Sequence, residues 1–152
     1  MSTNAEVVAL LKTAYRMELE TTMNYIANGI NLDGVRAEEI KKVLILDVTE
    51  ELGHAQQLAK RIKQLDDVVP GSLEMKFQQT CMQTPEKTTD LVGVIKGVIE
   101  AEEAAIAHYK VLIETAGAAK DYVTEDMCVQ LLASEEEHRV QFRGYLKEYT
   151  TD

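Results

Sequence analysis

One pattern of carboxylate, phenol and imidazole side chains occurs twice in this sequence. In each copy a Glu is followed seven residues later by a Tyr and 33 residues later by a Glu-x-x-His motif. The two copies are Glu18, Tyr25, Glu51 and His54, and Glu102, Tyr109, Glu135 and His138. A single Glu-x-x-His is weak evidence, but here two of the chain's three histidines close the motif at identical offsets. The repeat therefore predicts a metal site built from four carboxylates and two imidazoles.

These six side chains suit a pair of metal ions held inside a protein core. Four glutamates at one depth carry a charge of about −4, which is costly in a core unless it is paired or coordinates metal. Two divalent ions cancel that charge, and oxygen and imidazole ligands without thiolates favour iron, with manganese as the alternative. One tetrahedral zinc needs fewer than six ligands. Without metal, the glutamates should hold protons at raised pKa values, because like charges disfavour joint ionisation.

Hydrophobic periodicity predicts four long helices that carry these side chains. We expect helices over residues 4–31, 36–66, 88–115 and 124–148. Gly117 is the expected stop signal after the third helix. Glu18 and Glu102 fall on the apolar stripes of the first and third helices. In the second and fourth, the i, i+3 spacing of Glu-x-x-His projects both side chains from one face.

Other polar residues on these helices are predicted to lie away from the core. Glu20 stands four residues after Arg16, a spacing typical of a solvated pair, and Glu50 falls off the inner stripe of its helix. We expect the same exposure for Glu103, Glu136 and His108. Tyr25 and Tyr109 fit either a role beside the carboxylates or ordinary core packing, and their spacing leaves both interpretations open.

Residues 67–87 form a connection too long for a tight turn, and we expect a short helix over 72–79 within it. Four amphipathic helices with one long crossover predict an all-α protein, an antiparallel four-helix bundle. We expect residues 1–152 to be a single domain whose halves, 1–66 and 88–149, are related by approximate two-fold symmetry.

The composition excludes several classes of protein. A formal charge of −10 argues against nucleic-acid binding and suits cationic cargo. No apolar run approaches the roughly 18 residues that span a bilayer, and the start lacks a signal-peptide pattern, so we expect no membrane association and a cytoplasmic location. Cys81 and Cys128 form no Cys-x-x-Cys pair and are expected to be ordinary reduced thiols.

The two motifs together resemble those of the ferritin-like superfamily. Among its members, bacterioferritins and Dps-like proteins with a bacterioferritin-type di-iron site are the most similar. The resemblance covers nearly the whole chain and rests on Glu18, Tyr25, the segment Glu51–His54, Glu102, the segment Asp121–Thr124 and the segment Glu135–His138.

This resemblance implies a role for each residue. Glu51 and Glu135 would bridge two irons, Tyr25 would stand beside the site as a hydrogen-bond or redox neighbour, and the terminal ligands would be Glu18 with His54 and Glu102 with His138. The implied reaction is ferroxidation, in which two Fe(II) bind, O₂ or H₂O₂ accepts their electrons and Fe(III) passes into a mineral store.

Differences from the family pattern bear on the expected cofactor, the number of subunits and the function. Bacterioferritins bind haem through a Met at the position of Leu52, so we expect no haem. Only 14 residues follow His138, which favours a Dps-like dodecamer of identical chains, or a smaller assembly, over a shell of 24 subunits. A rubrerythrin-type peroxidase or oxidase without mineral storage ranks lower, because the positions one turn from Glu102 are not acidic. A non-catalytic metal-binding scaffold is the remaining alternative.

Overall fold

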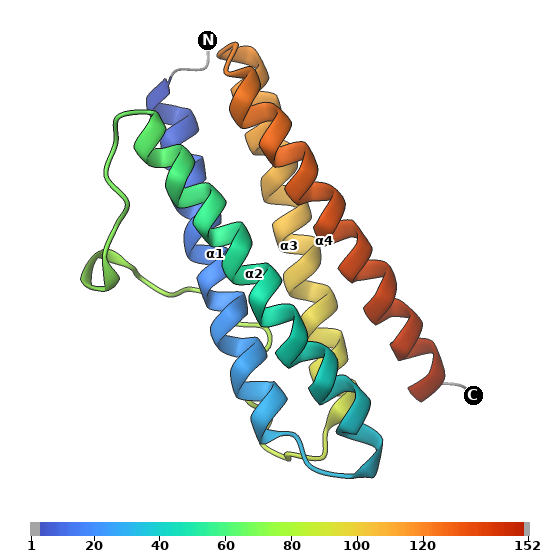
Figure 1. Ribbon diagram of the computed structural model, residues 1–152. Helices are drawn as coiled ribbons and strands as arrows, with labels where there is room; N and C mark the ends of the chain where they lie inside the picture. Colours follow the sequence, from blue (N-terminus) through green and yellow to red (C-terminus); the bar gives the residue numbers. More distant parts are fainter. Residues whose placement is uncertain (1–3, 151–152) are drawn as a thin grey trace.

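Four long helices joined by one long crossover make up the protein (Figure 1). The computed structural model describes residues 4–150. The helices are α1 (Asn4–Asn31), α2 (Glu38–Gln64), α3 (Leu91–Ala118) and α4 (Tyr122–Tyr149), with the 3-10 turns η1 (Val35–Ala37) before α2 and η2 (Ser72–Glu74) in the crossover. No strand occurs within residues 4–150. The predicted all-α four-helix bundle is confirmed.

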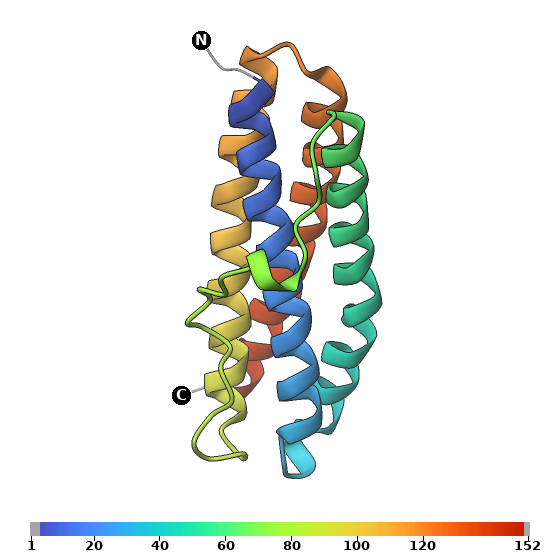
Figure 2. The ribbon, with the colours of Figure 1, turned by 90° about the vertical axis from the view of Figure 1, so that its left-hand side faces the viewer.

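Helices that follow one another in the sequence pack as antiparallel pairs, α1 against α2 and α3 against α4. The two pairs meet chiefly through α1 and α3, whereas α2 and α4 approach each other less closely. In Figure 2 the crossover runs from the end of α2 across α1 and then along α3. The α1/α3 side of the bundle is therefore the side that the crossover covers.

Aspartate side chains set the starts of the second helix pair. Asp90 accepts a hydrogen bond from the main-chain N–H of Gly93, and α3 consequently begins at Leu91 rather than at the predicted residue 88. Asp121 accepts in the same way from the N–H of Thr124, so α4 begins two residues earlier than predicted.

The prediction that Gly117 ends the third helix is wrong. The helix continues to Ala118, and Lys120 takes the left-handed conformation, with φ of 58°, that closes the turn. The Lys120 N–H donates to the Gly117 carbonyl. Asp66, with φ of 62°, ends α2 in the same manner. At both helix ends, a residue other than glycine adopts the left-handed conformation that glycine most often takes.

Glu20 corrects another prediction, because it is buried, with 2% of its surface exposed, and does not face solvent. Its carboxylate accepts hydrogen bonds from the main-chain N–H groups of Gln78 (2.6 Å) and Gln79 (2.5 Å) and from Arg16 Nε (3.0 Å). These bonds hold the crossover in an extended conformation, so the predicted short helix over 72–79 forms only as η2. The polar face of α1 is buried because another segment lies on it.

The core consists of two apolar clusters separated along the bundle by a polar layer. One cluster contains Tyr25, Leu44, Val98 and Phe142, and the other contains Leu11, Leu58, Tyr109 and Leu131. In every helix, the glutamate or Glu-x-x-His motif of the repeat lies between the residues of the two clusters. Hydrophobic packing above and below fixes the depth at which these polar side chains meet.

Candidate metal centre

Six polar side chains converge from all four helices in the layer between the apolar clusters. Each is at most 5% exposed: Glu18, Glu51, His54, Glu102, Glu135 and His138. These are the six residues that the repeat pointed to, and the heptad spacing of their helices turns every one of them inward. Charged groups buried to this extent require compensation by partners or by metal.

The six side chains form two overlapping sets. Ligand atoms of Glu18, Glu51, His54 and Glu135 lie within 4.8 Å of one another, and so do those of Glu51, Glu102, Glu135 and His138. Glu51 and Glu135 belong to both sets. The arrangement therefore offers two neighbouring cation positions that share two carboxylates, with one further carboxylate and one imidazole for each position.

Buried polar atoms that lack a hydrogen-bond partner show whether these side chains are suited to binding metal ions. Each of the six side chains has one buried atom without a hydrogen-bond partner: Glu18 Oε2, Glu51 Oε1, His54 Nδ1, Glu102 Oε2, Glu135 Oε1 and His138 Nδ1. Buried polar atoms in native proteins are almost always paired, so six orphans in one layer indicate a missing partner. Oxygen and imidazole atoms without thiolates suit iron or manganese.

Both imidazoles turn the same nitrogen toward the carboxylates. His54 Nδ1 lies 3.2 Å from Glu135, and His138 Nδ1 lies 3.2 Å from Glu51. The other nitrogen of each ring faces Glu50, at 3.9 Å from His54 Nε2 and 3.0 Å from His138 Nε2. A carboxylate that accepts from Nε2–H leaves the Nδ1 lone pair for a metal.

Glu50 thus contributes to the site, which the sequence prediction missed. Its side chain is 47% exposed, as its position off the inner stripe implied, yet it faces both imidazoles and accepts from Ser134 Oγ at 2.6 Å. The i, i+4 spacing of Glu50 and His54 was the signal available in the sequence.

Without metal, the cluster holds protons. Burial raises the pKa values of Glu51 and Glu102 well above the ordinary carboxyl range, and neighbouring carboxylates raise them further. Although burial opposes the cationic form, the nearby glutamate carboxylates raise the pKa of His54 to about 10 and that of His138 to about 9. Burial also opposes ionisation of Glu135, but the adjacent Glu102 and both imidazoles lower the pKa of that carboxyl.

Two buried tyrosines connect the halves of the chain. The Tyr25 hydroxyl donates to Glu102 Oε1 and the Tyr109 hydroxyl donates to Glu18 Oε1, both at 2.6 Å. Burial and the adjacent carboxylates raise both phenol pKa values well above 10, so both hydroxyls remain donors. Tyr109, which the sequence left as a possible packing residue, makes the symmetry-related bond to that of Tyr25.

Comparisons with known proteins decide the family. A family model described as a ferritin-like domain matches residues 8–151. The chain belongs to the ferritin-like domain family. No curated protein matches it significantly in sequence.

Solved structures of ferritin-like proteins share the fold. A ferritin-like di-iron-carboxylate protein from Bacillus anthracis matches with a TM-score of 0.84 at 20% identity, covering 96% of this chain and 99% of that one. Bacterioferritin from Rhodobacter capsulatus gives 0.82 at 20% identity, covering 98% and 88%. Dps from Staphylococcus aureus gives 0.88 at 19% identity, covering 96% and 98%. At these identities the likeness establishes the fold.

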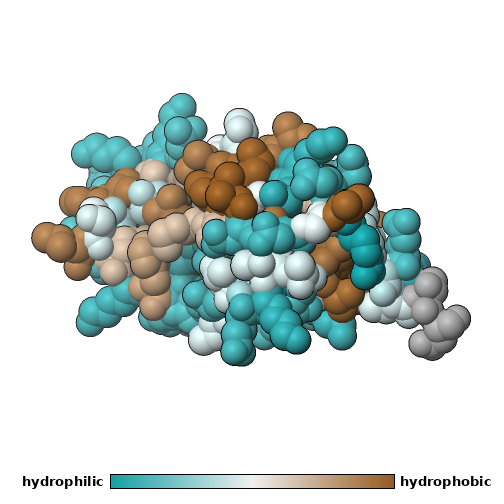
Figure 3. Space-filling model, turned by 90° about the horizontal axis from the view of Figure 1, so that it is seen from below, coloured by the Kyte–Doolittle hydropathy of each residue, from teal (hydrophilic) through white to brown (hydrophobic). Residues whose placement is uncertain are grey.

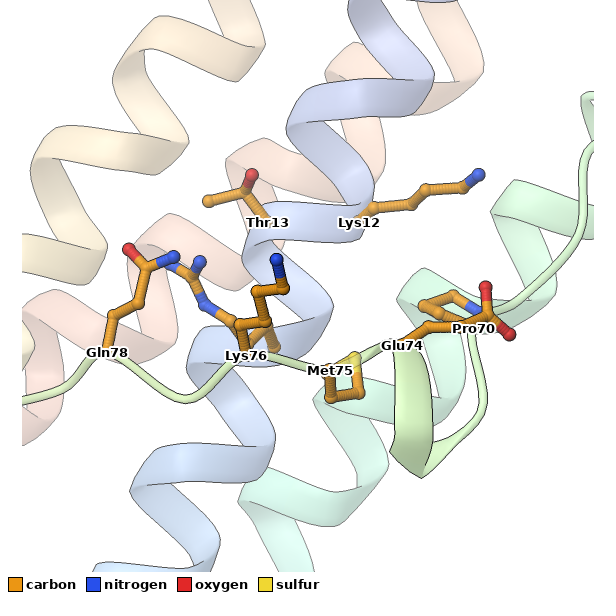
Figure 4. Close-up of a pocket in the computed structure, with 8 residues that line it drawn as sticks. Lys12, Thr13, Pro70, Glu74, Met75, Lys76 and Gln78 are labelled. Carbon is orange, nitrogen blue, oxygen red and sulfur yellow. The ribbon is translucent and has the colours of Figure 1, made fainter.

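The surface hollows of this ferritin-like chain differ in how closely they approach the buried cluster. Figure 4 shows one of about 340 Å³ between α1 and the crossover, lined by Lys12, Arg16 and Lys76 among others and by none of the six side chains. An acidic hollow of about 430 Å³, lined by Asp47 and Glu50, reaches His138 between α2 and α4. Between α1 and α3, a neck of only about 10 Å³ opens on the carboxylates.

Of the three other side chains predicted to be exposed, one is exposed and two are half-buried. Glu103 is exposed, as predicted, and pairs with Arg143 at 2.9 Å, whereas Glu136 is half-buried. His108 is also half-buried, contrary to prediction, because its Nε2 bonds to the Leu10 carbonyl at 2.9 Å across α1 and α3.

Both thiols of the ferritin-like chain are unpaired. Cys128 is buried, and burial raises its pKa to about 12, while Cys81 lies half-buried in the crossover. No helix within residues 4–150 combines the length and the apolarity that crossing a membrane requires.

Proposed function

We propose that the protein is a ferroxidase that oxidises Fe(II) with O₂ or H₂O₂ at an intra-chain di-iron centre and stores or detoxifies the product. The convergence of six buried orphan atoms on two shared positions carries this proposal. Glu51 and Glu135, which belong to both side-chain sets, would be the carboxylates that the two ions share. Glu18 and His54 complete one position, and the other is completed by Glu102 and His138.

The chain's own residues supply geometry, charge and proton transfer. Two bound Fe(II) ions supply one electron each to the oxidant, which gives Fe(III) as product. Four carboxylates offset the charge of two divalent ions, and both imidazoles must release a proton before they can bind. Glu50, 3.0 Å from His138 Nε2, holds the proton of that nitrogen, so the proton that leaves on metal binding is the one on Nδ1. We expect no haem, because Leu52 offers no axial ligand.

A shell of identical chains is part of the proposal. Bacterioferritin and Dps are among the structures with this fold. Apolar side chains that a lone chain leaves exposed follow one side of the α1/α2 pair: Met23, Ile26, Ile30, Ile45, Leu46 and Leu52. Figure 3 shows apolar side chains among hydrophilic ones at the end of the bundle seen from below. A group of exposed apolar side chains such as this one favours contact with another chain, which would remove the apolar surface from water.

Aerobic titration with Fe(II) tests the function. We expect a fast phase that ends at two irons per chain, followed by slower uptake into a mineral, both followed by ferric absorbance. Oxidation that stops at two irons would favour a non-storing oxidase or peroxidase. No oxidation above the rate in buffer would leave only a metal-binding scaffold and would contradict the proposal.

Tyr25→Phe is expected to slow the fast phase roughly tenfold, because Glu102 Oε1 loses a hydrogen bond to a charged group. Binding of two Co(II) ions per chain should be retained. Tyr109→Phe is the matched control, since it removes the equivalent bond to Glu18. Equal slowing in both variants assigns Tyr25 a positioning role, and slowing only in Tyr25→Phe assigns it an electron-transfer role. A wild-type rate in Tyr25→Phe contradicts both roles.

A further inference from the structure

A narrow neck between α1 and α3 opens onto the buried carboxylates. Its volume of about 10 Å³ is near the space that one water molecule occupies. Met17, Ala101 and Ala105 form its apolar walls, and the four glutamates of the cluster lie at its inner end. A single small species, stripped of most of its hydration, is the largest that can pass.

A wider hollow of about 270 Å³ lies outside this neck. Its lining includes the ion pair of Arg16 with Glu20, the carboxylate of Glu100 and the thiol of Cys81. Met17 and Gln79 line both the hollow and the neck, so the two are adjacent and these side chains lie between them. Any species moving inward from the hollow must pass Gln79.

The crossover is fastened to both helices that flank the neck. On α1, Glu20 accepts from the main-chain N–H groups of Gln78 and Gln79. On α3, a Cβ at Gly97 would lie only 3.0 Å from Met82 N, so the absence of a side chain there lets the crossover lie directly on the helix. Figure 2 shows the crossover spanning this side of the bundle.

The Gln79 side chain is fixed at both ends of its amide. Its Nε2 donates to Thr21 Oγ1 (3.1 Å), and its Oε1 accepts from Asn24 Nδ2 (2.7 Å). Thr21 itself lines the neck. Both bonds are neutral and are made by a side chain, so they can break without disturbing the main-chain bonds to Glu20.

We propose that divalent metal ions reach the di-iron centre through this opening and that Gln79 controls the passage. The inference rests on the proposed function. The carboxylate of Glu100 at the outer end and the four glutamates at the inner end favour a cation, and the amide oxygen of Gln79 is itself a ligand for hard cations. Swinging the Gln79 side chain aside opens the neck, while the crossover backbone stays in place.

Stopped-flow binding of Co(II), which is not oxidised by air on this timescale, tests the proposal. In Gln79→Ala we expect both the association and the dissociation rate constants to rise about tenfold, because two neutral hydrogen bonds no longer hold the passage closed. The dissociation constant and the stoichiometry of two ions per chain should stay unchanged. Asn24→Ala, which removes one of the two bonds, should give a smaller rise. Gln57→Ala, at an exposed position on α2, is the matched control and should behave as wild type.

Two results overturn the proposal. Co(II) rates in Gln79→Ala within twofold of wild type mean that ions reach the centre by another path. Unchanged Co(II) rates with faster oxidation of pre-bound Fe(II) assign the opening to the oxidant instead. Failure of the metal centre itself is distinguishable, because wild-type protein would then bind no Co(II) at the paired sites.

Discussion

Glu51→Ala is expected to slow aerobic Fe(II) oxidation at least about a hundredfold, since loss even of an outer partner of a metal ligand commonly costs 10- to 100-fold. Glu51 belongs to both ligand sets, so its removal weakens both positions rather than one. Ferric absorbance after mixing with Fe(II) measures the rate, and Co(II) titration measures the sites. We expect fewer than two tightly bound ions per chain.

The fold should survive this substitution. Burial raises the pKa of Glu51 well above its usual range, so the metal-free protein gains little from its carboxylate. We expect the melting temperature of metal-free Glu51→Ala to equal or exceed that of wild type. Fast oxidation in the variant would show that the bridging assignment is wrong.

Adjacent glutamates on α3 provide a matched pair for the same measurement. Glu102→Ala removes a buried candidate ligand and should abolish the fast phase. Glu103→Ala, one residue further, removes an exposed carboxylate paired with Arg143 and should leave the rate unchanged. Equal rates in the two variants would place the chemistry outside the buried cluster.

Metal saturation is expected to raise the melting temperature by about 10 °C at neutral pH. A ligand at a thousand times its dissociation constant stabilises the native state by about 4 kcal/mol, and in a chain of this size each kcal/mol shifts the midpoint by about 2–4 °C. Calorimetry of the metal-free and Co(II)-loaded protein measures the shift, and a chelator should reverse it. An unchanged midpoint at saturating Co(II) would contradict a buried two-ion site.

The pH dependence of this shift has a definite sign. The raised pKa values of His54, about 10, and His138, about 9, make imidazolium a stabilising group in the metal-free protein. That contribution is complete below the unfolded value of about 6.5 and is lost as pH rises through the folded values. Metal binding must displace the same protons. The gain in melting temperature from Co(II) should therefore be larger at about pH 8 than at about pH 6.

The sequence repeat was enough to predict the six converging side chains, because their environment depends on helical period alone. Each of these side chains occupies a core-facing position of its helix. When the four helices pack, Glu18 and Glu102 therefore meet the two Glu-x-x-His motifs at one depth of the bundle. The role of these residues as metal ligands remains a prediction for the experiments above to test.

Residues whose surroundings come from the crossover could not be predicted in this way. The pattern of α1 alone predicts that Glu20 is exposed. It is buried because residues 77–82 of the crossover lie over it. Gln79 lies in a segment without periodicity, so its place over the neck had no signal in the sequence. Glu50 is the intermediate case, since its spacing from His54 was visible but its distance to His138 depends on how α2 and α4 pack.

The exchange of tyrosine bonds has a consequence for how such a chain could arise. Each α-helical hairpin supplies a phenol to the carboxylate of the other, together with one imidazole and one glutamate that belongs to both side-chain sets. Two identical hairpins in a symmetric dimer would hold the full set of groups, which is the arrangement expected of a duplicated ancestor. The two hairpins depart from this equivalence at Glu20, which corresponds to Ala104, and at Glu50, which corresponds to Ser134, so the groups around the cluster differ between its two halves.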